Sequence, residues 1–265
     1  ATDYVILSRP RTRVCRRTHR RRAMSITVHQ FPCLSDNYGY LIRDSETGAV
    51  ATIDTPDADA ILNQAQALGW TITDIWNTHW HPDHAGGNAK IIEATGAKVT
   101  GPAEVSRIAA APDLVVSGGE IVRLGDSEAL VIDGGGRSRG HIAFHFPQES
   151  KAFVGDSLFA LGCGRLFEGT AEQMWASLQR LMALPAETAV YCAHEYTTTN
   201  LAFAQSVSDA PALKARAEVI RALRASGKPT VPTTIGDELE TNPFLQAGSA
   251  ARFGELRAAK DGFKG

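Results

Sequence analysis

The sequence predicts an α/β fold of mixed sheets flanked by helices, followed by a small helical region. Two observations lead to this prediction. Between Met24 and His194, short apolar runs with strand character alternate with segments of helical spacing. After His194, helical spacings continue, separated by proline and glycine. We therefore expect one domain at residues 24–194 and a second, helical domain at residues 195–265.

The first half of the larger domain is predicted to be rich in strands. One helix is expected at Ala58–Leu68, where Gly69 ends the pattern, and another at His84–Ala94, which stops near Gly96. The strands expected around these helices are Ile26–Phe31, Tyr38–Arg43, Val50–Asp54, Ile72–Asn77 and Lys98–Thr100.

The remaining elements follow the same reasoning. Four more strands and one apolar run of similar character are expected at Glu120–Leu124, Ala129–Ile132, His141–Phe146, Ala152–Val154 and Thr188–Ala193. The C-terminal helices are expected at Leu201–Ser208, Leu213–Ser226 and Ser249–Ala259. Mixed sheets with outer helices account for this order of elements.

The composition fits a soluble enzyme. The chain has 265 residues, of which 43% are hydrophobic and 21% charged, so it can bury a substantial core. No apolar stretch is long enough to cross a membrane, and no hydrophobic block of a secretory signal opens the chain. The four cysteines are scattered without paired spacing, which favours reduced thiols and a cytoplasmic location.

Residues 1–23 form a basic leader that differs from the rest of the chain. Eight of the 27 basic residues but one of the 29 acidic residues precede Met24, so the remainder carries a net charge of −9. The leader resembles an organelle transit peptide, could bind nucleic acid or acidic surfaces, or lies upstream of a natural start at Met24. We favour the third interpretation, and expect disorder in each case.

The segment from Thr78 to His84 is the most informative part of the sequence. It contains four side chains that can bind a metal, namely His79, His81, Asp83 and His84, followed by two glycines. A closed structural zinc site uses four thiolate or imidazole ligands and leaves no position for substrate. Clustered imidazoles and carboxylates suit zinc, iron or manganese with open positions. The segment therefore indicates a catalytic metal site, and favours hydrolysis.

The spacing within this segment favours two neighbouring ions. His79 and His81 are two residues apart, so in an extended or tightly turned segment both can reach one ion. Asp83 and His84 then point elsewhere and can bind a second ion. The additional ligands are expected at the ends of later strands, where side chains meet at one sheet edge. These candidates are His141, Asp156 and His194.

In order and spacing, these seven residues resemble the metal ligands of the metallo-β-lactamase superfamily. Later motifs are similar to those of the glyoxalase II (hydroxyacylglutathione hydrolase) family, and the resemblance extends from about Ile26 to the C-terminus. The motifs are Gly155-Asp156-Ser157-Leu158-Phe159, Gly162-Cys163-Gly164-Arg165, Ala193-His194-Glu195-Tyr196-Thr197, Asn242-Pro243-Phe244 and Arg257-Ala258-Ala259-Lys260-Asp261.

The resemblance implies an αββα sandwich with a small C-terminal helical domain that hydrolyses S-acyl-glutathione thioesters. The implied substrate is S-D-lactoylglutathione, cleaved to D-lactate and glutathione in the second step of methylglyoxal detoxification. The implied cofactors are two divalent metal ions, zinc first, with iron and manganese left open, and a hydroxide bound by both attacks the thioester.

Each ligand receives an expected place from the resemblance. His79, His81 and His141 would hold the first ion, and Asp83, His84 and His194 the second, with Asp156 as the bridging ligand. Asp83 and Asp156 are the expected catalytic residues, because Asp83 could also orient the hydroxide.

The resemblance also implies a glutathione site and a small-molecule partner. Arg165 and Tyr196 would line the tripeptide site, and Arg257 with Lys260 would contact the glycine carboxylate. Phe167 belongs to the same site. We expect a monomer without a membrane partner, and nucleic acid only as a partner of the leader.

Two departures from the family pattern bear on this site. The segment Gly134–His141 replaces the usual Thr-Pro-Gly-His-Thr approach to the Gly-His ligand. It places Arg137 near two cations, where it would be repelled unless it turns outward or pairs with an acid such as Asp133. Phe167 stands where many relatives have tyrosine, and it cannot donate a hydrogen bond. We therefore expect weaker glutathione binding than in relatives with the tyrosine.

Two alternative functions stay open at this point. Another enzyme of the same superfamily, such as a persulfide dioxygenase, would use one iron ion, but the full second set of ligands argues for the hydrolase. A different class of function, binding to nucleic acid or acidic surfaces, would depend on the basic leader.

Overall fold

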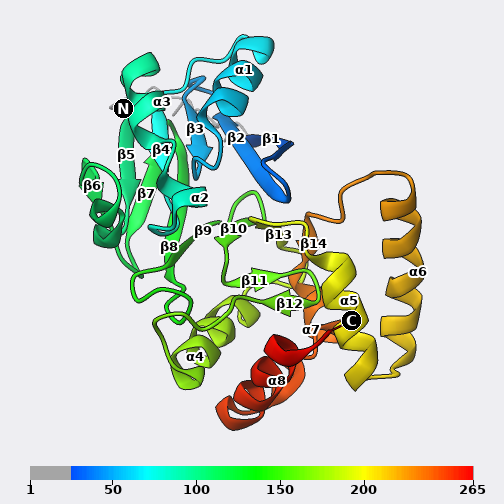
Figure 1. Cartoon of the computed structure of the whole chain (residues 1–265). Coiled ribbons are helices and arrows are strands. Elements are labelled where there is room, and N and C mark those ends of the chain that lie inside the picture. The colour runs from blue at the N-terminus through cyan, green and yellow to red at the C-terminus, as the bar shows by residue number, and fades with distance from the viewer. Residues whose placement is uncertain (1–24, 265) are drawn as a thin grey trace, which may run out of the picture.

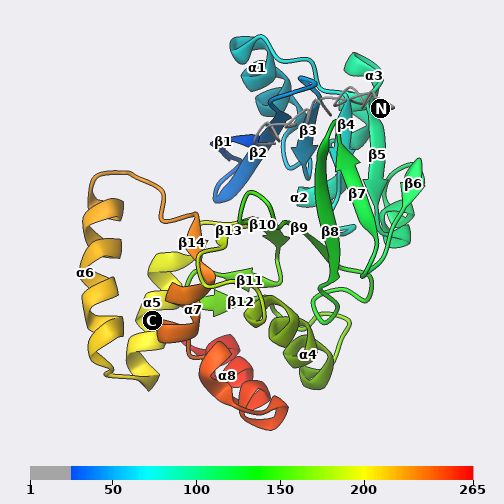
Figure 2. The same cartoon turned by 180° about the vertical axis from the view of Figure 1, so that it is seen from behind.

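The structure is a computed structural model that describes residues 25–264, so the expectations for the leader lie outside the described residues. Two six-stranded sheets pack against each other, and helices cover their outer faces (Figures 1 and 2). The predicted αββα sandwich with a C-terminal helical region is therefore confirmed. No helix in residues 25–264 is long and apolar enough to span a membrane.

The first sheet combines antiparallel and parallel pairing. β1, β2 and β3 are antiparallel neighbours, whereas β3 to β6 are parallel. Its strands, in spatial order, are β1 (Ile26–Cys33), β2 (Asn37–Asp44), β3 (Val50–Ile53), β4 (Asp74–Trp76), β5 (Lys98–Gly101) and β6 (Leu114–Val115).

The second sheet is antiparallel except where β10 pairs with β13. Its strands, in spatial order, are β14 (Thr233–Thr234), β13 (Ala189–Cys192), β10 (Lys151–Gly155), β9 (Ile142–Phe146), β8 (Ser127–Asp133) and β7 (Ile121–Leu124). A separate hairpin pairs β11 (Leu158–Phe159) with β12 (Gly162–Cys163).

The helices fall into two groups. Those before residue 183 lie along the sheets, and those after residue 196 gather beyond β14 (Figure 1). The helices are α1 (Ala58–Leu68), α2 (Pro82–Ala85), α3 (Asn88–Thr95), η1 (Ala103–Arg107), α4 (Ala171–Met182), α5 (Thr197–Val207), α6 (Pro211–Ala225), α7 (Ile235–Thr241), η2 (Leu245–Ala247) and α8 (Ala250–Gly262).

Aromatic side chains join the two sheets. Trp76 of β4 packs against Phe144 and Phe146 of β9, with ring centroids 5.0 and 5.8 Å apart. Tyr40 of β2 meets Phe153 of β10 at 5.6 Å. Because strand side chains alternate between faces, the neighbouring Leu41 points the other way, into a second core beneath α1 and α3. The sheets are therefore held by burial on both faces of the first sheet.

Most predicted elements are confirmed within a few residues, and α1 matches its expected range. Its caps explain the agreement: the Asp57 side chain accepts from the Ala60 N–H, and Gly69 adopts a left-handed conformation with φ of 66°. The predicted strand Ile72–Asn77 is shortened to β4.

The predicted helix His84–Ala94 was wrong as one element, because α2 ends at Ala85 and α3 begins at Asn88. The break lies at Gly86 and Gly87. A Cβ on Gly87 would lie 2.7 Å from the Thr55 carbonyl oxygen, so the chain passes too close to the segment after β3 for a larger residue. This close approach lets the ligand segment turn toward the sheet edge.

Several elements were not predicted. The helix α4 has a capping box in which Thr170 and Gln173 bond reciprocally, a signal that the sequence does contain. The helix α7 and the two-residue strands are too short for a periodic pattern to identify them.

A buried ion pair connects the last helices. Glu238 of α7 is fully buried and pairs with Arg216 of α6. Its carboxylate also accepts hydrogen bonds from the Leu161 N–H and the Asn242 side chain, each at 2.9 Å. Because every partner is buried or half-buried, this carboxylate fixes α6, α7 and the β11–β12 hairpin relative to one another.

Replacement of Glu238 by alanine should lower the free energy of unfolding by about 3–5 kcal/mol, because Arg216 loses its partner in a dry environment. Urea denaturation followed by circular dichroism measures this loss. Glu218→Ala is the matched control, since Glu218 and Arg221 form an exposed ion pair within α6. Equal losses in the two variants would contradict the role assigned to Glu238.

Candidate metal centre

All seven expected metal ligands lie at one edge of the sandwich. His79 and His81 follow β4, Asp83 and His84 belong to α2, and the remaining three adjoin strands of the second sheet. His141 precedes β9, Asp156 follows β10, and His194 comes two residues after β13. The residues therefore meet at one sheet edge, as we expected for side chains at the ends of strands.

The glycine before Asp156 allows this convergence. Gly155 has φ of +50°, and a Cβ there would lie 2.6 Å from Thr78 Oγ1 and 2.8 Å from His141 Nε2. A side chain at this position would therefore collide with the ligand segment itself. Glycine is required for the Asp156 carboxylate to reach the centre.

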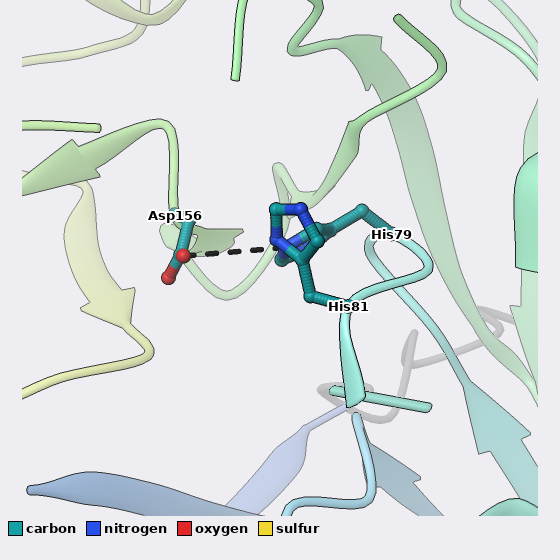
Figure 3. Close-up of side chains that lie close together, drawn as sticks. All are labelled: His79, His81 and Asp156. Carbon is teal, nitrogen blue, oxygen red and sulfur yellow. Dashed lines mark hydrogen bonds and ion pairs between the residues drawn. The ribbon is translucent and has the colours of Figure 1, made fainter. Parts of the chain in front are cut away.

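His79, His81 and Asp156 form the first candidate ligand group. His79 Nε2 and His81 Nδ1 are 2.8 Å apart, and His79 Nε2 lies 4.0 Å from Asp156 Oδ2. Figure 3 shows both imidazoles directed toward the carboxylate from the loop after β4. One potential ligand atom from each residue lies within 4.8 Å of the other two, which is the spacing of ligands around one ion.

Asp83, His84 and His194 form the second candidate group, whose ligand atoms also lie within 4.8 Å of one another. Asp83 Oδ2 is 3.5 Å from Nε2 of each histidine. Asp156 faces this group too, since its Oδ1 lies 3.5 Å from His84 Nε2 and 3.2 Å from His194 Nε2. One carboxylate therefore stands between the two groups.

His141 lies beside the first group without joining it in this arrangement. Its ring centroid is 4.6 Å from that of His79. However, its Nε2 accepts a hydrogen bond from the Asp156 N–H at 3.1 Å, and its Nδ1 meets Ser157 Oγ at 3.1 Å. For His141 to act as the third ligand of this ion, its Nε2 would have to bind the ion in place of the Asp156 N–H.

Two aspartates that the sequence reasoning missed orient the ligands. Asp54 receives hydrogen bonds from the Thr78 N–H at 2.7 Å and contacts His84 Nδ1 at 2.8 Å. Asp36 contacts His194 Nδ1 at 2.8 Å. Such contacts fix the ring orientation and leave Nε2 facing the centre. Asp54 directly follows a buried strand, as Asp156 does, and this position in the sequence could have identified Asp54 as a residue of the site.

The two groups differ in electrostatics. Burial, together with His84 and His141, holds the pKa of His79 well below its usual value, and burial lowers the pKa of His141 to about 3. Burial also lowers the pKa of His84, but the carboxylates of Asp156 and Asp54 outweigh it and raise that pKa to about 10. His79 and His141 are thus neutral imidazoles, the form that binds metals, whereas an ion at the second group would replace the proton on His84.

The polar atoms of the centre fit a divalent cation. In residues 25–264, His84 Nε2, His194 Nε2 and Asp156 Oδ1 are buried and form no hydrogen bond. Buried polar groups are almost always hydrogen-bonded, so these three atoms call for a partner. Nitrogen and carboxylate donors grouped in this way suit divalent metals. The fold and these clusters therefore support divalent metal ions as cofactors.

Arg137 reaches the centre as well. The sequence led us to expect that Arg137 either turns outward or pairs with an acid such as Asp133. In the structure Arg137 does pair with an acid, but that acid is Asp156. Arg137 Nη2 lies 2.6 Å from Asp156 Oδ2, whereas Asp133 accepts a hydrogen bond from the Gly118 N–H. The guanidinium also lies over the Phe167 ring, 4.5 Å from its centroid.

A basic cleft adjoins the centre, and it contains all five expected substrate-binding residues. Its volume is about 470 Å³. The residues lining it are Arg137, Phe159, Cys163, Arg165, Phe167, Tyr196, Thr199, Asn200, Arg257, Lys260, Asp261 and Phe263. Four cationic side chains and one carboxylate give the cleft a positive charge, in a chain whose residues 24–265 are acidic.

The side chains that line the cleft differ in their exposure and in their contacts. Tyr196 stacks on His194 with ring centroids 4.6 Å apart, so it joins the cleft to the second ligand group. Phe167 is 60% exposed and Arg165 is also exposed. Arg257 is buried and donates to the Cys163 carbonyl oxygen and to Asp261. Lys260 donates to the Thr199 carbonyl oxygen.

Comparison with known families divides the chain into two matches. Residues 40–194 match the model of the metallo-beta-lactamase superfamily, and residues 195–263 match that of the hydroxyacylglutathione hydrolase C-terminus. The first match contains the candidate ligands, and the second contains seven residues of the cleft, namely Tyr196, Thr199, Asn200, Arg257, Lys260, Asp261 and Phe263.

Curated relatives and solved structures agree with these matches. Hydroxyacylglutathione hydrolases of Hyphomonas neptunium and Erythrobacter litoralis are 53% and 54% identical to the chain, and each alignment covers 90% of it. The alignments span 98% and 100% of those two proteins.

Among solved structures, ETHE1 from Myxococcus xanthus superimposes with a TM-score of 0.68 at 28% identity, over 88% of this chain and 90% of that one. A di-iron-bound form of TTHA1623 superimposes with a TM-score of 0.59 at 27% identity, over 83% of this chain and 100% of that one. Together with the family matches and the curated relatives, these likenesses show that the chain belongs to the hydroxyacylglutathione hydrolase family of the metallo-beta-lactamase superfamily.

Proposed function

We propose that this chain hydrolyses S-acyl-glutathione thioesters, with S-D-lactoylglutathione as its main substrate in methylglyoxal detoxification. The observation that carries the proposal is the basic cleft beside the two groups of candidate metal-binding side chains, which it reaches through Arg137 at Asp156 and Tyr196 at His194. Glutathione carries carboxylates, which the cleft can attract, and a thioester carbonyl can then lie beside the ligand groups. Relatives that share half of the sequence are named for this activity.

We assign the seven ligands to two divalent ions, with zinc as the first choice. His79, His81 and His141 would hold one ion, Asp83, His84 and His194 the other, and Asp156 would contact both. Bound ions of this kind supply a nucleophile at neutral pH by lowering the pKa of water, and they stabilise developing negative charge. Asp54 and Asp36 support this chemistry by fixing the orientation of His84 and His194.

The cleft residues bind and orient the tripeptide. Arg165 is exposed, Lys260 is half-buried, and both line the cleft, so both can meet carboxylates of glutathione. Tyr196, stacked on His194, limits how the thioester can lie against the second group. The departing thiolate needs no acid residue, because a thiol has a pKa of about 8.5.

This function also assigns roles to the two parts of the chain. Residues 24–194 would form the catalytic domain and residues 195–265 the glutathione-binding domain. The helical part is joined to the catalytic part through β14, which pairs with β13. The monomeric state and the cytoplasmic location stay predictions.

The proposed activity requires both metal and Asp156. Purified protein should cleave S-D-lactoylglutathione, lose that activity in a chelator, and regain it with added zinc. Asp156→Asn should lower kcat by more than about 100-fold, since changes outside the ligand set already cost about 10- to 100-fold. Loss of the thioester absorbance and metal analysis of the same samples provide the measurements.

Asp126→Asn is the control for this experiment. It removes the same charge as Asp156→Asn, but from an exposed residue in the turn between β7 and β8. Thioester cleavage that persists in the chelated, metal-depleted protein would refute the proposal. A single iron per chain with oxidation of glutathione persulfide, in place of hydrolysis, would support the dioxygenase alternative.

Phe167→Tyr should lower KM for S-D-lactoylglutathione by about 2- to 10-fold, the equivalent of one hydrogen bond, with kcat unchanged. The ring is mostly exposed at the cleft and lies 5.7 Å from the His81 ring, so a hydroxyl there can reach bound substrate. Steady-state kinetics of both proteins tests this. An unchanged or higher KM would show that Phe167 does not contact the tripeptide.

A further inference from the structure

The glycine-rich segment before His141 is built to direct one side chain inward. The Arg137 carbonyl oxygen accepts hydrogen bonds from the Phe167 and Glu168 N–H groups, at 3.3 and 3.2 Å. Beyond it, the Gly140 N–H donates to Glu104 at 2.8 Å. Gly136 has φ of +131°, a conformation suited to glycine alone. The backbone of Arg137 is therefore held on both sides, with its side chain facing the centre.

The Arg137 side chain is correspondingly ordered by its contacts. It is 14% exposed, its Nη2 lies 2.6 Å from Asp156 Oδ2, and its guanidinium stacks on Phe167. Its Nε is buried and makes no hydrogen bond within the part of the chain that the structure describes. An arginine so placed is a fixed positive charge beside the carboxylate that both ligand groups share.

The two oxygens of Asp156 face different groups. Oδ1 faces His84 and His194, and Oδ2 faces His79 at 4.0 Å. Arg137 binds Oδ2, which is the oxygen that an ion at His79 and His81 would use. A guanidinium and a divalent cation repel each other at this distance, so the presence of Arg137 at this oxygen weakens the binding of an ion there.

We propose that Arg137 competes with the metal ion at His79 and His81 for Asp156, so that the two sites differ in affinity. The site at Asp83, His84 and His194 fills first. The site at His79 and His81 fills second and more weakly, because the ion must displace the guanidinium. Arg137 already lines the basic cleft, so the displaced charge moves toward the substrate side. This inference rests on the proposed dinuclear centre.

The test is a zinc titration of the metal-free full-length protein against a chromophoric competing chelator. Two binding steps are expected for the wild type. In Arg137→Gln, the weaker step should tighten by about 10-fold or more, because the competing charge is gone, whereas the tighter step should stay within about 2-fold. Cobalt absorption spectra provide a second readout of the same sequence of filling.

Arg139→Gln is the matched control. Arg139 lies two residues away in the same segment, is exposed, and lines a different hollow with Arg107 and Glu168. This variant removes the same charge from the same loop, so it should leave both steps unchanged. Arg137→Lys keeps a cation near Asp156 and should retain the weak second step.

Thermal unfolding adds a measurement that does not depend on zinc affinity. Metal-free Arg137→Gln should unfold at a lower temperature than metal-free wild type, since buried Asp156 loses one of its three cationic partners, and the difference should vanish with two ions bound. Equal tightening in Arg137→Gln and Arg139→Gln, or no tightening in either, would overturn the competition. A wild type that binds fewer than two ions and cleaves no thioester would overturn the dinuclear centre itself.

Discussion

The buried carboxylate of Asp156 is the constraint on which the rest of this site depends. A carboxylate without exposure to water must be compensated by positive charge, because the desolvation of an ion costs several kcal/mol. Here the compensation comes from His84, His194 and Arg137, all within 3.5 Å. Burial opposes the charged form of Asp156, but His84 and His194 outweigh it and hold the pKa of this carboxyl well below its usual value. The local backbone follows from the same requirement, since only glycine at position 155 lets the carboxylate enter.

The site is built from two separate parts of the fold. The ligands stand at the ends of strands whose aromatic side chains interlock across the two sheets, so their positions are set by the core. The basic cleft lies where α5 and α8 meet the loop after β12. A fixed centre with a separately built cleft explains how one superfamily fold can accept different substrates.

The sequence predicted most of the strands, the C-terminal cap of α1 and the convergence of seven candidate ligands, because these depend on periodicity, on glycine at a helix end and on the geometry of strand ends. It did not predict the break between α2 and α3, which arises from a close approach to the segment after β3 that only the tertiary structure reveals. Asp54 and Asp36 were missed for a similar reason, since their role is to bond with histidines that are distant in sequence. The partner of Arg137 was open between several acids, and the fold of the glycine-rich segment decided among them.

The two departures from the family pattern are best understood as one unit. Gly136 and Gly169 pack so closely that a Cβ on Gly169 would lie 2.5 Å from the Gly136 Cα. That contact brings the segment of Phe167 against the segment of Arg137, and the phenyl ring then supplies an apolar face for the guanidinium. An arginine turned toward a buried carboxylate needs such a surface, because its planar faces form no hydrogen bonds. The glycine-rich segment and Phe167 therefore act together: both departures from the family pattern accommodate the inward-facing side chain of Arg137.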